Sequence, residues 1–200
     1  MYGEEQMPAP LPEGVHGRPL LVEYGMASWY GPKYQKHRAA DGSVYDQNEM
    51  TAAHRELPMG SIVRVTNVVT GQSVIVRITD RGPFVPGRIL DLSMGAAKAI
   101  GVYRAGVARV KIEAWELPGT DTAGRWCVQI GAFKHEGDAM DVKEELERRY
   151  RTARVIEFTG PTGHWVRIHP ATPDHAHANQ IARDLSLPDP NASPYVVRLN

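Results

Sequence analysis

The middle of the chain alternates between apolar and polar positions, as a β-strand with one buried face does. Val63 and Val65 alternate with polar residues in Ser61–Val68, and the same pattern recurs in Ser73–Thr79 and Val107–Trp115. The first two runs are joined by Thr70-Gly71, which predicts a β-hairpin. A single short helix is expected at Met94–Ile100, with Ser93 as its N-cap and Gly101 at its end. The pattern therefore predicts a small β-barrel over residues 25–117.

The last third of the chain has a different pattern. Strands and helices are expected in the order strand, helix, strand, strand, helix, strand, over the following segments: Trp126–Phe133, Glu136–Tyr150, Ala153–Phe158, His164–Ile168, Pro173–Leu185 and Tyr195–Leu199. The order βαββαβ predicts a ferredoxin-like, four-stranded sheet with both helices on one face. The other face would be left free to bind a ligand.

Proline and glycine mark the borders of these two regions. The proline-rich residues 1–24 are expected to be an extended lead-in, and the turn-rich residues 118–123 a linker. The predicted domains are therefore a barrel at 25–117 and an α+β domain at 124–200.

Composition excludes several classes of function. The 23 basic side chains equal the 23 acidic ones, so a nucleic-acid partner is not expected. Cys127 is the only cysteine, which rules out an intrachain disulfide and a paired-cysteine zinc site. No apolar stretch is long enough to span a bilayer, and the N-terminus lacks the pattern of a secretion signal. We expect no metal, because His175 and His177 point to different sides of a helix, and no other cofactor.

The segment Thr79–Phe84 has the highest density of residues suited to chemistry. Asp80 shares the parity of Val76 and Ile78, which predicts that its side chain leaves the strand on the core side at the rim of the barrel. Partial shielding from water there would raise the pKa of the carboxyl group. The alternative is that Asp80 caps the following turn or pairs with Arg81.

Each of the other polar and aromatic candidates allows two interpretations, one functional and one structural. His54 follows the small apolar residues Thr51–Ala53, and a histidine in such a place is more often a hydrogen-bonded core residue than a catalyst. Trp29, Tyr30 and Tyr34 supply aromatic rings that either stack under sugars or pack in the core.

Several motifs, taken in order, resemble the rare lipoprotein A (RlpA) family. They are Gly25–Gly31, Ala39–Gly42, Tyr45-Asp46, Thr51–His54, Leu57-Pro58, Val63–Asn67, Thr79–Phe84 and Asp91–Ser93. This resemblance implies a six-stranded double-psi β-barrel, a fold shared with expansins and some lytic transglycosylases. Residues 124–200, with Trp126–Phe133 as the first strand, are similar to the sporulation-related repeat (SPOR) domain.

The SPOR resemblance implies that the free sheet face binds peptidoglycan glycan strands that lack stem peptides. By alternation, Val128 and Ile130 face the helices. Gln129, Trp165 and Arg167 are then expected on the outward face, as candidate sugar contacts.

The RlpA resemblance implies a lytic transglycosylase that cleaves the MurNAc–GlcNAc bond to 1,6-anhydro products. His54 and Asp80 match residues of the family site, with Trp29, Tyr30 and Arg81 as candidate substrate contacts. One position departs from the family, because Ser43 stands where active members carry a glutamate. Serine does not titrate near neutral pH and cannot replace a carboxyl group.

Two functions therefore remain open, a transglycosylase weakened at position 43 and a non-catalytic, expansin-like peptidoglycan-binding protein. A hydrolase of other polysaccharides is disfavoured, because a SPOR domain points to the bacterial wall. The resemblance further implies a monomeric protein of the bacterial cell envelope, periplasmic or associated with the outer membrane at the division septum. Family members are often lipoproteins, and no leader or anchoring cysteine is present in this sequence.

Overall fold

The computed structural model describes residues 6–115 and 123–200. The chain divides into two compact units, Met1–Thr120 and Asp121–Asn200, and each is described by itself. Of the predicted linker 118–123, all but Ala123 lies outside the described residues.

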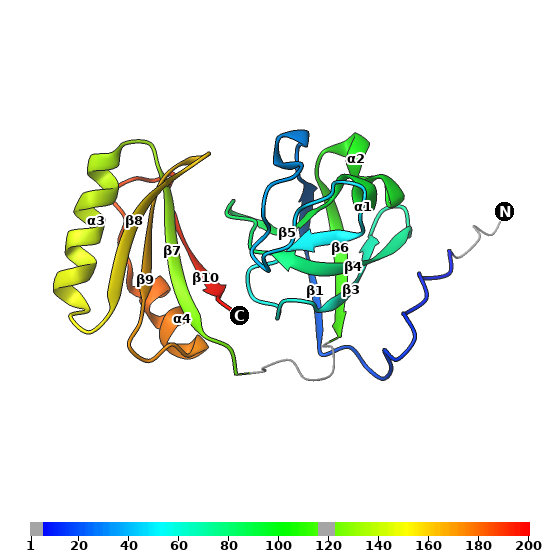
Figure 1. The fold of residues 1–200 in the computed structure, drawn as a ribbon, viewed down its shortest axis with the longest axis horizontal. Coiled ribbons are helices and arrows are strands. Elements are labelled where there is room, and N and C mark those ends of the chain that lie inside the picture. Colours follow the sequence, from blue (N-terminus) through cyan, green and yellow to red (C-terminus); the bar gives the residue numbers. More distant parts are fainter. Residues whose placement is uncertain (1–5, 116–122) are drawn as a thin grey trace. The chain divides into compact units, whose positions relative to one another are not determined.

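Six strands of the first unit close into a barrel (Figure 1). They are β1 (Leu21–Trp29), β2 (Thr51–Ala53), β3 (Ile62–Asn67), β4 (Ser73–Asp80), β5 (Arg88–Leu92) and β6 (Ala108–Trp115). Their order around the barrel is β1-β5-β2-β4-β3-β6. The β1–β5 and β2–β4 pairs are parallel and the others antiparallel. The six-stranded barrel predicted from the sequence is confirmed.

The predicted hairpin is formed by β3 and β4, which pair in antiparallel fashion. Val63, Val65, Val76 and Ile78 are all fully or almost fully buried in the barrel core. Gly71 lies in the connecting turn with φ +74°, a conformation that L side chains rarely adopt. Alternation and turn chemistry together fix the register of this hairpin.

The first strand begins earlier than the sequence pattern indicated. β1 starts at Leu21, within the segment assigned to the lead-in, and pairs with β6 from Leu21 opposite Ala114. Its outward side chains Val22 and Tyr24 are apolar and exposed, so the alternation that marks the other strands is absent here. Pairing with β6 establishes this part of the strand.

The predicted helix at Met94–Ile100 is present as α1 (Met94–Ala99). Ser93 is its N-cap, as predicted, and Ser93 Oγ accepts a hydrogen bond from the N–H of Ala96. The sequence pattern missed α2 (Val102–Ala105) and the 3₁₀ turn η1 (Pro32–Tyr34). Both are too short to show a helical period.

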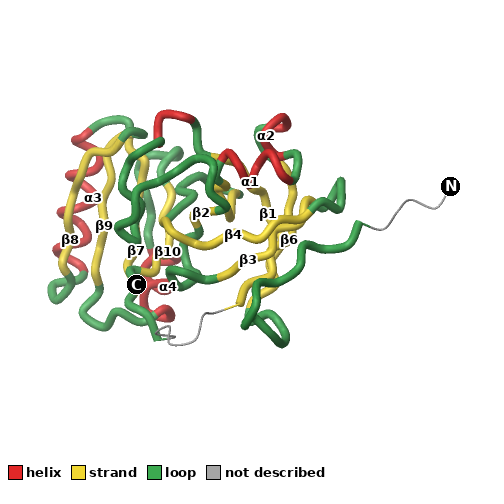
Figure 2. Tube along the Cα trace, turned by 45° about the vertical axis from the view of Figure 1, so that its right-hand side comes forward, coloured by secondary structure: helices red, strands yellow, loops and turns green. Residues whose placement is uncertain are grey.

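The second unit has the predicted order βαββαβ. Its elements are β7 (Trp126–Phe133), α3 (Glu136–Arg149), β8 (Arg154–Gly160), β9 (Gly163–His169), α4 (His175–Asp184) and β10 (Ser193–Arg198). The sheet order is β10-β7-β9-β8. Helix α3 packs on β7, β8 and β9 and α4 on β7 and β10, and Figure 2 shows α3 behind β8 and β9. The ferredoxin-like arrangement is confirmed, with element ends shifted by a few residues.

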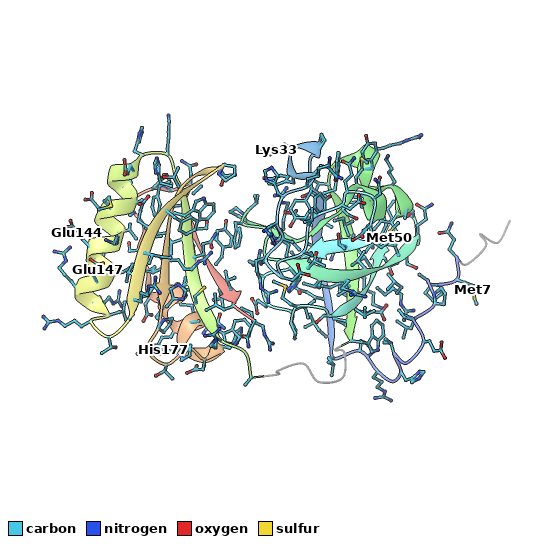
Figure 3. All side chains as sticks on the ribbon, viewed as in Figure 1. Met7, Lys33, Met50, Glu144, Glu147 and His177 are labelled. Carbon is cyan, nitrogen blue, oxygen red and sulfur yellow. The ribbon has the colours of Figure 1, made fainter. Side chains whose placement is uncertain are left out.

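The apolar side of α3 meets the sheet through Ala139, Val142 and Leu146, which are buried. Glu144 and Glu147 lie on its exposed side, away from the sheet (Figure 3). No described helix is long and apolar enough to cross a membrane.

Candidate functional site

Asp80 ends strand β4 at a β-bulge. Ile78 lies opposite Ala52 of β2, and Asp80 lies opposite Ala53, so Thr79 is an extra residue in β4. Ala52 belongs to the core cluster, and its neighbour Ala53 faces the other side of the sheet. The extra residue reverses which side chains at the end of the strand face the core. Asp80 therefore lies on the outer side of the barrel sheet, and the prediction that it leaves on the core side is wrong.

The Asp80 carboxyl group is shielded and fully hydrogen-bonded. Oδ1 accepts from the backbone N–H groups of Arg81 at 2.8 Å and Ala40 at 3.0 Å, and Oδ2 accepts from the Tyr30 hydroxyl at 3.0 Å. Burial raises the pKa of Asp80, the three hydrogen bonds oppose this, and the nearby Asp41 adds to the rise. The net direction is upward. The predicted rise in the pKa of this carboxyl is confirmed.

A pocket of about 210 Å³ opens beside Asp80. Its wall is aromatic, since the Tyr30 ring meets the rings of Tyr34 and Tyr45 edge-on, with centroids 5.3 Å away in each case. The remaining lining residues are His37, Arg38 and Ala39. A carboxyl group beside rings that can pack against sugars is suited to bind and protonate a glycan.

Most of this pocket wall comes from the connection between β1 and β2. The sequence pattern does not single out His37, Arg38, Ala39 or Tyr45, because this long irregular segment has no periodicity. The family motifs Ala39–Gly42 and Tyr45-Asp46 fall in this segment and contain two of the four residues.

His54 is buried, as predicted, and both ring nitrogens have partners. Nδ1 accepts from the backbone N–H groups of Glu56 and Leu57, each at 3.0 Å. Nε2 therefore carries the proton and lies 3.4 Å from Glu23 Oε2. The hydrogen bond from His54 lowers the pKa of Glu23 against the opposing effect of burial. The sequence reasoning missed Glu23, which lies 31 positions away.

The chain beside His54 is tied to the Asp80 segment. The His54 N–H donates to the backbone carbonyl of Asp80 at 3.2 Å. Arg81 Nη1 donates to the carbonyl oxygens of His54 at 3.1 Å and Leu57 at 2.7 Å. His54 and Arg81 thus support the backbone that carries Asp80.

Ser43 lies on the same connecting segment and is exposed. Its Oγ and its N–H both donate to Asp41 Oδ1, at 2.6 and 2.8 Å. The Asp41 N–H donates to the carbonyl of Thr79 at 3.1 Å, which joins this turn to the Asp80 strand.

Of the two aromatic candidates, Tyr30 lines the pocket and contacts Asp80. Trp29 packs with its ring centroid 4.7 Å from that of Tyr103 on α2, partly against the barrel core. Within residues 6–115 and 123–200, no group of three or more His, Cys, Asp or Glu side chains could hold a metal ion.

The second unit has Gln129, Trp165 and Arg167 on the sheet face opposite the helices. Gln129 lies directly opposite Arg167, and Val128 and Ile130 are in the helix-facing core, so the predicted faces are confirmed. Arg167 donates to Gln129 Oε1 through Nη2 at 2.6 Å and Nε at 3.2 Å, and its guanidinium lies 5.2 Å from the Phe158 ring centroid.

Two of these side chains are less accessible than alternation predicted. Gln129 and Trp165 are 3% and 4% exposed. Trp165 packs closely on Gly131 of the adjacent strand, where a Cβ atom would come within 2.6 Å of the indole, and its ring centroid is 6.4 Å from that of Tyr195. Of the three, Arg167 is the one that is not buried.

Comparison with known proteins gives matches for both units. A family model described as lytic transglycolase matches residues 22–112, and one described as SPOR domain matches residues 122–198. The endolytic peptidoglycan transglycosylase RlpA of Vibrio cholerae is 38% identical over 162 residues, which is 77% of this chain and 61% of that protein. RlpA of Campylobacter jejuni is 33% identical over 199 residues, which is 87% of this chain and 71% of that protein.

A probable endolytic peptidoglycan transglycosylase RlpA of Synechocystis is 54% identical over 92 residues, which is 46% of this chain and 29% of that protein. The chain thus spans less than two thirds of the Synechocystis and Vibrio proteins and somewhat more than two thirds of the Campylobacter protein. The higher identity lies in the match that covers only about half of this chain.

Proposed function

The chain belongs to the RlpA family, and from this premise we propose that it is a lytic transglycosylase that cleaves peptidoglycan glycan strands. The bond cleaved is that between MurNAc and GlcNAc, and the product ends in 1,6-anhydro-MurNAc. The observation that carries this proposal is Asp80, a shielded carboxyl group with a raised pKa beside a tyrosine-lined pocket.

Asp80 is suited to exchange a proton with the sugar. In this reaction an acid protonates the glycosidic oxygen, and the 6-hydroxyl of MurNAc attacks the anomeric carbon. Because the nucleophile belongs to the substrate, one carboxyl group can first donate a proton and then accept one from the hydroxyl. A raised pKa keeps part of the Asp80 population protonated at higher pH, as a general acid requires.

His54 and Arg81 act here through the backbone. His54 orders residues 54–57 through two N–H groups, and Arg81 joins that segment to the strand end. Both therefore hold Asp80 in position.

The sheet unit would hold the glycan while the barrel cuts it. Arg167 offers a cation and hydrogen-bond donors on the face opposite the helices, next to the aromatic rings of Phe158 and Trp165. Such a face suits glycan strands that lack stem peptides. The family further suggests an envelope protein at the division septum, associated with the outer membrane as a lipoprotein.

Ser43 favours a second candidate, a non-catalytic wall-binding protein resembling expansins. The position of the family glutamate holds an exposed hydroxyl that is bonded to Asp41. In this alternative the barrel pocket binds a glycan without cleaving it.

The two candidates are separated by product analysis. Full-length chain is incubated with peptide-stripped glycan strands, and mass spectrometry follows products that end in 1,6-anhydro-MurNAc. We expect such products from the wild type and a rate about 10²–10⁴-fold lower from Asp80→Asn, since asparagine keeps the shape without delivering a proton. Glycan binding without any anhydro product from the wild type would favour the non-catalytic alternative.

A further inference from the structure

A second carboxyl group lies across one strand from Asp80. Asp91 of β5 lies opposite Ala53 of β2, and Ala53 lies in turn opposite Asp80 of β4. Residues directly opposite one another share a face of the sheet. Neighbouring strands are about 4.8 Å apart, so the Cα atoms of the two aspartates are separated by roughly 10 Å.

The residue between them has a small, fully buried side chain. Ala53 has only a methyl group, so no large side chain separates the two carboxyl groups. Asp80 and Asp91 each raise the pKa of Tyr30, which is close to both. Asp80 also raises the pKa of Asp91. Carboxyl groups that act together on a glycosidic bond lie roughly 5 to 9.5 Å apart, close to the roughly 10 Å estimated between these two Cα atoms.

The contacts of Asp91 are confined to one oxygen. Oδ1 accepts from Ser28 Oγ at 2.5 Å and lies 3.9 Å from Arg88 Nη2. Among the described residues, no group donates a hydrogen bond to Oδ2, and the side chain is 14% exposed. Oδ2 is thus the oxygen left for a further hydrogen bond, and Asp91 itself lies outside the lining of the pocket beside Asp80.

The two aspartates differ in how many hydrogen bonds their carboxyl groups accept. Asp80 accepts three hydrogen bonds over both oxygens, an arrangement that stabilises the ionised form. Asp91 accepts one, and burial raises its pKa against the opposing effects of Ser28, Arg88 and Arg55.

Resting on the proposed transglycosylase activity, we infer that Asp91 is a second catalytic residue and supplies the carboxyl group that position 43 lacks. With two carboxyl groups, the donating role that the one-carboxyl scheme gives to Asp80 passes to Asp91, and Asp80 keeps the accepting role. Asp91 donates its proton to the glycosidic oxygen as the bond from the MurNAc anomeric carbon to that oxygen breaks, and GlcNAc leaves with a free hydroxyl. The MurNAc 6-oxygen bonds to the anomeric carbon, and its proton passes to Asp80. A proton then returns from Asp80 to Asp91 through water, which restores the starting state.

The test is the rate of anhydro-product release by the full chain on peptide-stripped strands. We expect Asp91→Asn to lower the rate by about 10²–10⁴-fold while glycan binding is retained. Asparagine can still accept the Ser28 hydrogen bond, so the fold should persist. Glu49→Gln, which removes an exposed carboxylate from the same barrel, is the matched control and should equal the wild type.

A second variant separates a chemical role from a structural one. Ser28→Ala removes the hydrogen bond that lowers the pKa of Asp91, so Asp91 should stay protonated to higher pH. The alkaline limb of the pH–rate profile should then move to higher pH. This variant decides the question if Asp91→Asn fails to fold, as judged by its melting curve.

The outcomes distinguish this inference from the function on which it rests. A wild type that releases no anhydro product contradicts the transglycosylase proposal itself. An active wild type with Asp91→Asn within a few-fold of it, or an alkaline limb that Ser28→Ala leaves in place, overturns the role of Asp91 alone.

Discussion

The two units collect opposite kinds of polar group. The barrel gathers carboxyl and phenol groups, and Asp80 and Asp91 are both close enough to Tyr30 to raise its pKa. The sheet unit presents a guanidinium, an amide and aromatic rings on one face, through Arg167, Gln129 and Trp165. Carboxyl groups can exchange protons with a sugar, and guanidinium and aromatic groups can only hold it. Under the proposed function, this difference assigns proton transfer to the barrel and glycan retention to the sheet unit.

The units also differ in how their groups are fixed in place. On the sheet, Arg167 and Gln129 are neighbours because adjacent strands pair in register. In the barrel, Asp80 is placed by a bulge and supported by hydrogen bonds from its neighbour Arg81 and from two distant positions, Tyr30 and Ala40. The barrel site should therefore be the more sensitive to loss of supporting contacts.

Removal of His54 should show this sensitivity most strongly. His54→Ala leaves the buried N–H groups of Glu56 and Leu57 without their acceptor, and it deletes the bond to Glu23. An unsatisfied buried group costs about 1–3 kcal/mol, so we expect the free energy of unfolding to fall by about 2–4 kcal/mol in urea titrations. His54→Asn is the matched variant, because its side-chain oxygen can take the place of Nδ1. It should recover most of the loss.

The same variants give a pH test. The pKa of Glu23 is lowered in the folded state, so its contribution to stability is present above the unfolded value near 4.5 and is lost as pH falls through the folded pKa. His54→Asn lacks Nε2 and should lose this acid-dependent term, although it keeps most of the stability at neutral pH. An unchanged acid slope in His54→Asn would show that Glu23 and His54 are not coupled.

The sequence predicted the faces of the regular strands correctly, but not the face of the bulged end of β4. Val63, Val65, Val128 and Ile130 were placed on the correct faces, because pairing in a regular strand preserves a period of two. Asp80 was placed on the wrong face, because the extra residue Thr79 reverses the parity and leaves no sign in the hydrophobic pattern.

The hydrophobic pattern also could not predict contacts between segments that are distant in the sequence. Tyr45 reaches the pocket through an irregular connection, and Glu23 meets His54 only because the barrel closes. On the sheet the faces were right and the exposure of Trp165 was wrong. Alternation states the side on which a ring lies, and it does not state what packs over that ring.

A smaller effect is expected on the sheet, and it concerns binding. Arg167→Ala removes the guanidinium that bonds Gln129, and we expect about tenfold weaker sedimentation with peptide-stripped peptidoglycan, as for the loss of one charged hydrogen bond. Release of anhydro products from short soluble strands should be unchanged. Arg167→Lys keeps the charge but not the paired donors, so its sedimentation with peptidoglycan should lie between that of the wild type and that of Arg167→Ala. Loss of cleavage along with binding would contradict the division between the units.

The smallest effect is expected at Ser43, where a glutamate would restore the family's carboxyl group. Ser43→Glu loses the hydroxyl bond to Asp41 but keeps the backbone N–H bond, so the turn should persist. The nearby Asp41 carboxylate would raise the pKa of the new glutamate and favour its acid form.

We expect the rate of anhydro-product release by Ser43→Glu to rise by about tenfold or less, because Asp80 and Asp91 already provide two carboxyl groups. The gain would fall short of the roughly 10²–10⁴-fold that a positioned acid or base contributes when no other group takes its place. Ser43→Gln has the same size without a proton to donate and should equal the wild type. A gain of a hundredfold or more in Ser43→Glu alone would mean that the barrel lacks a second carboxyl group, and Asp91 would lose its assigned role. Equal rates in all three proteins would leave the chemistry of the barrel to the two aspartates on either side of Ala53.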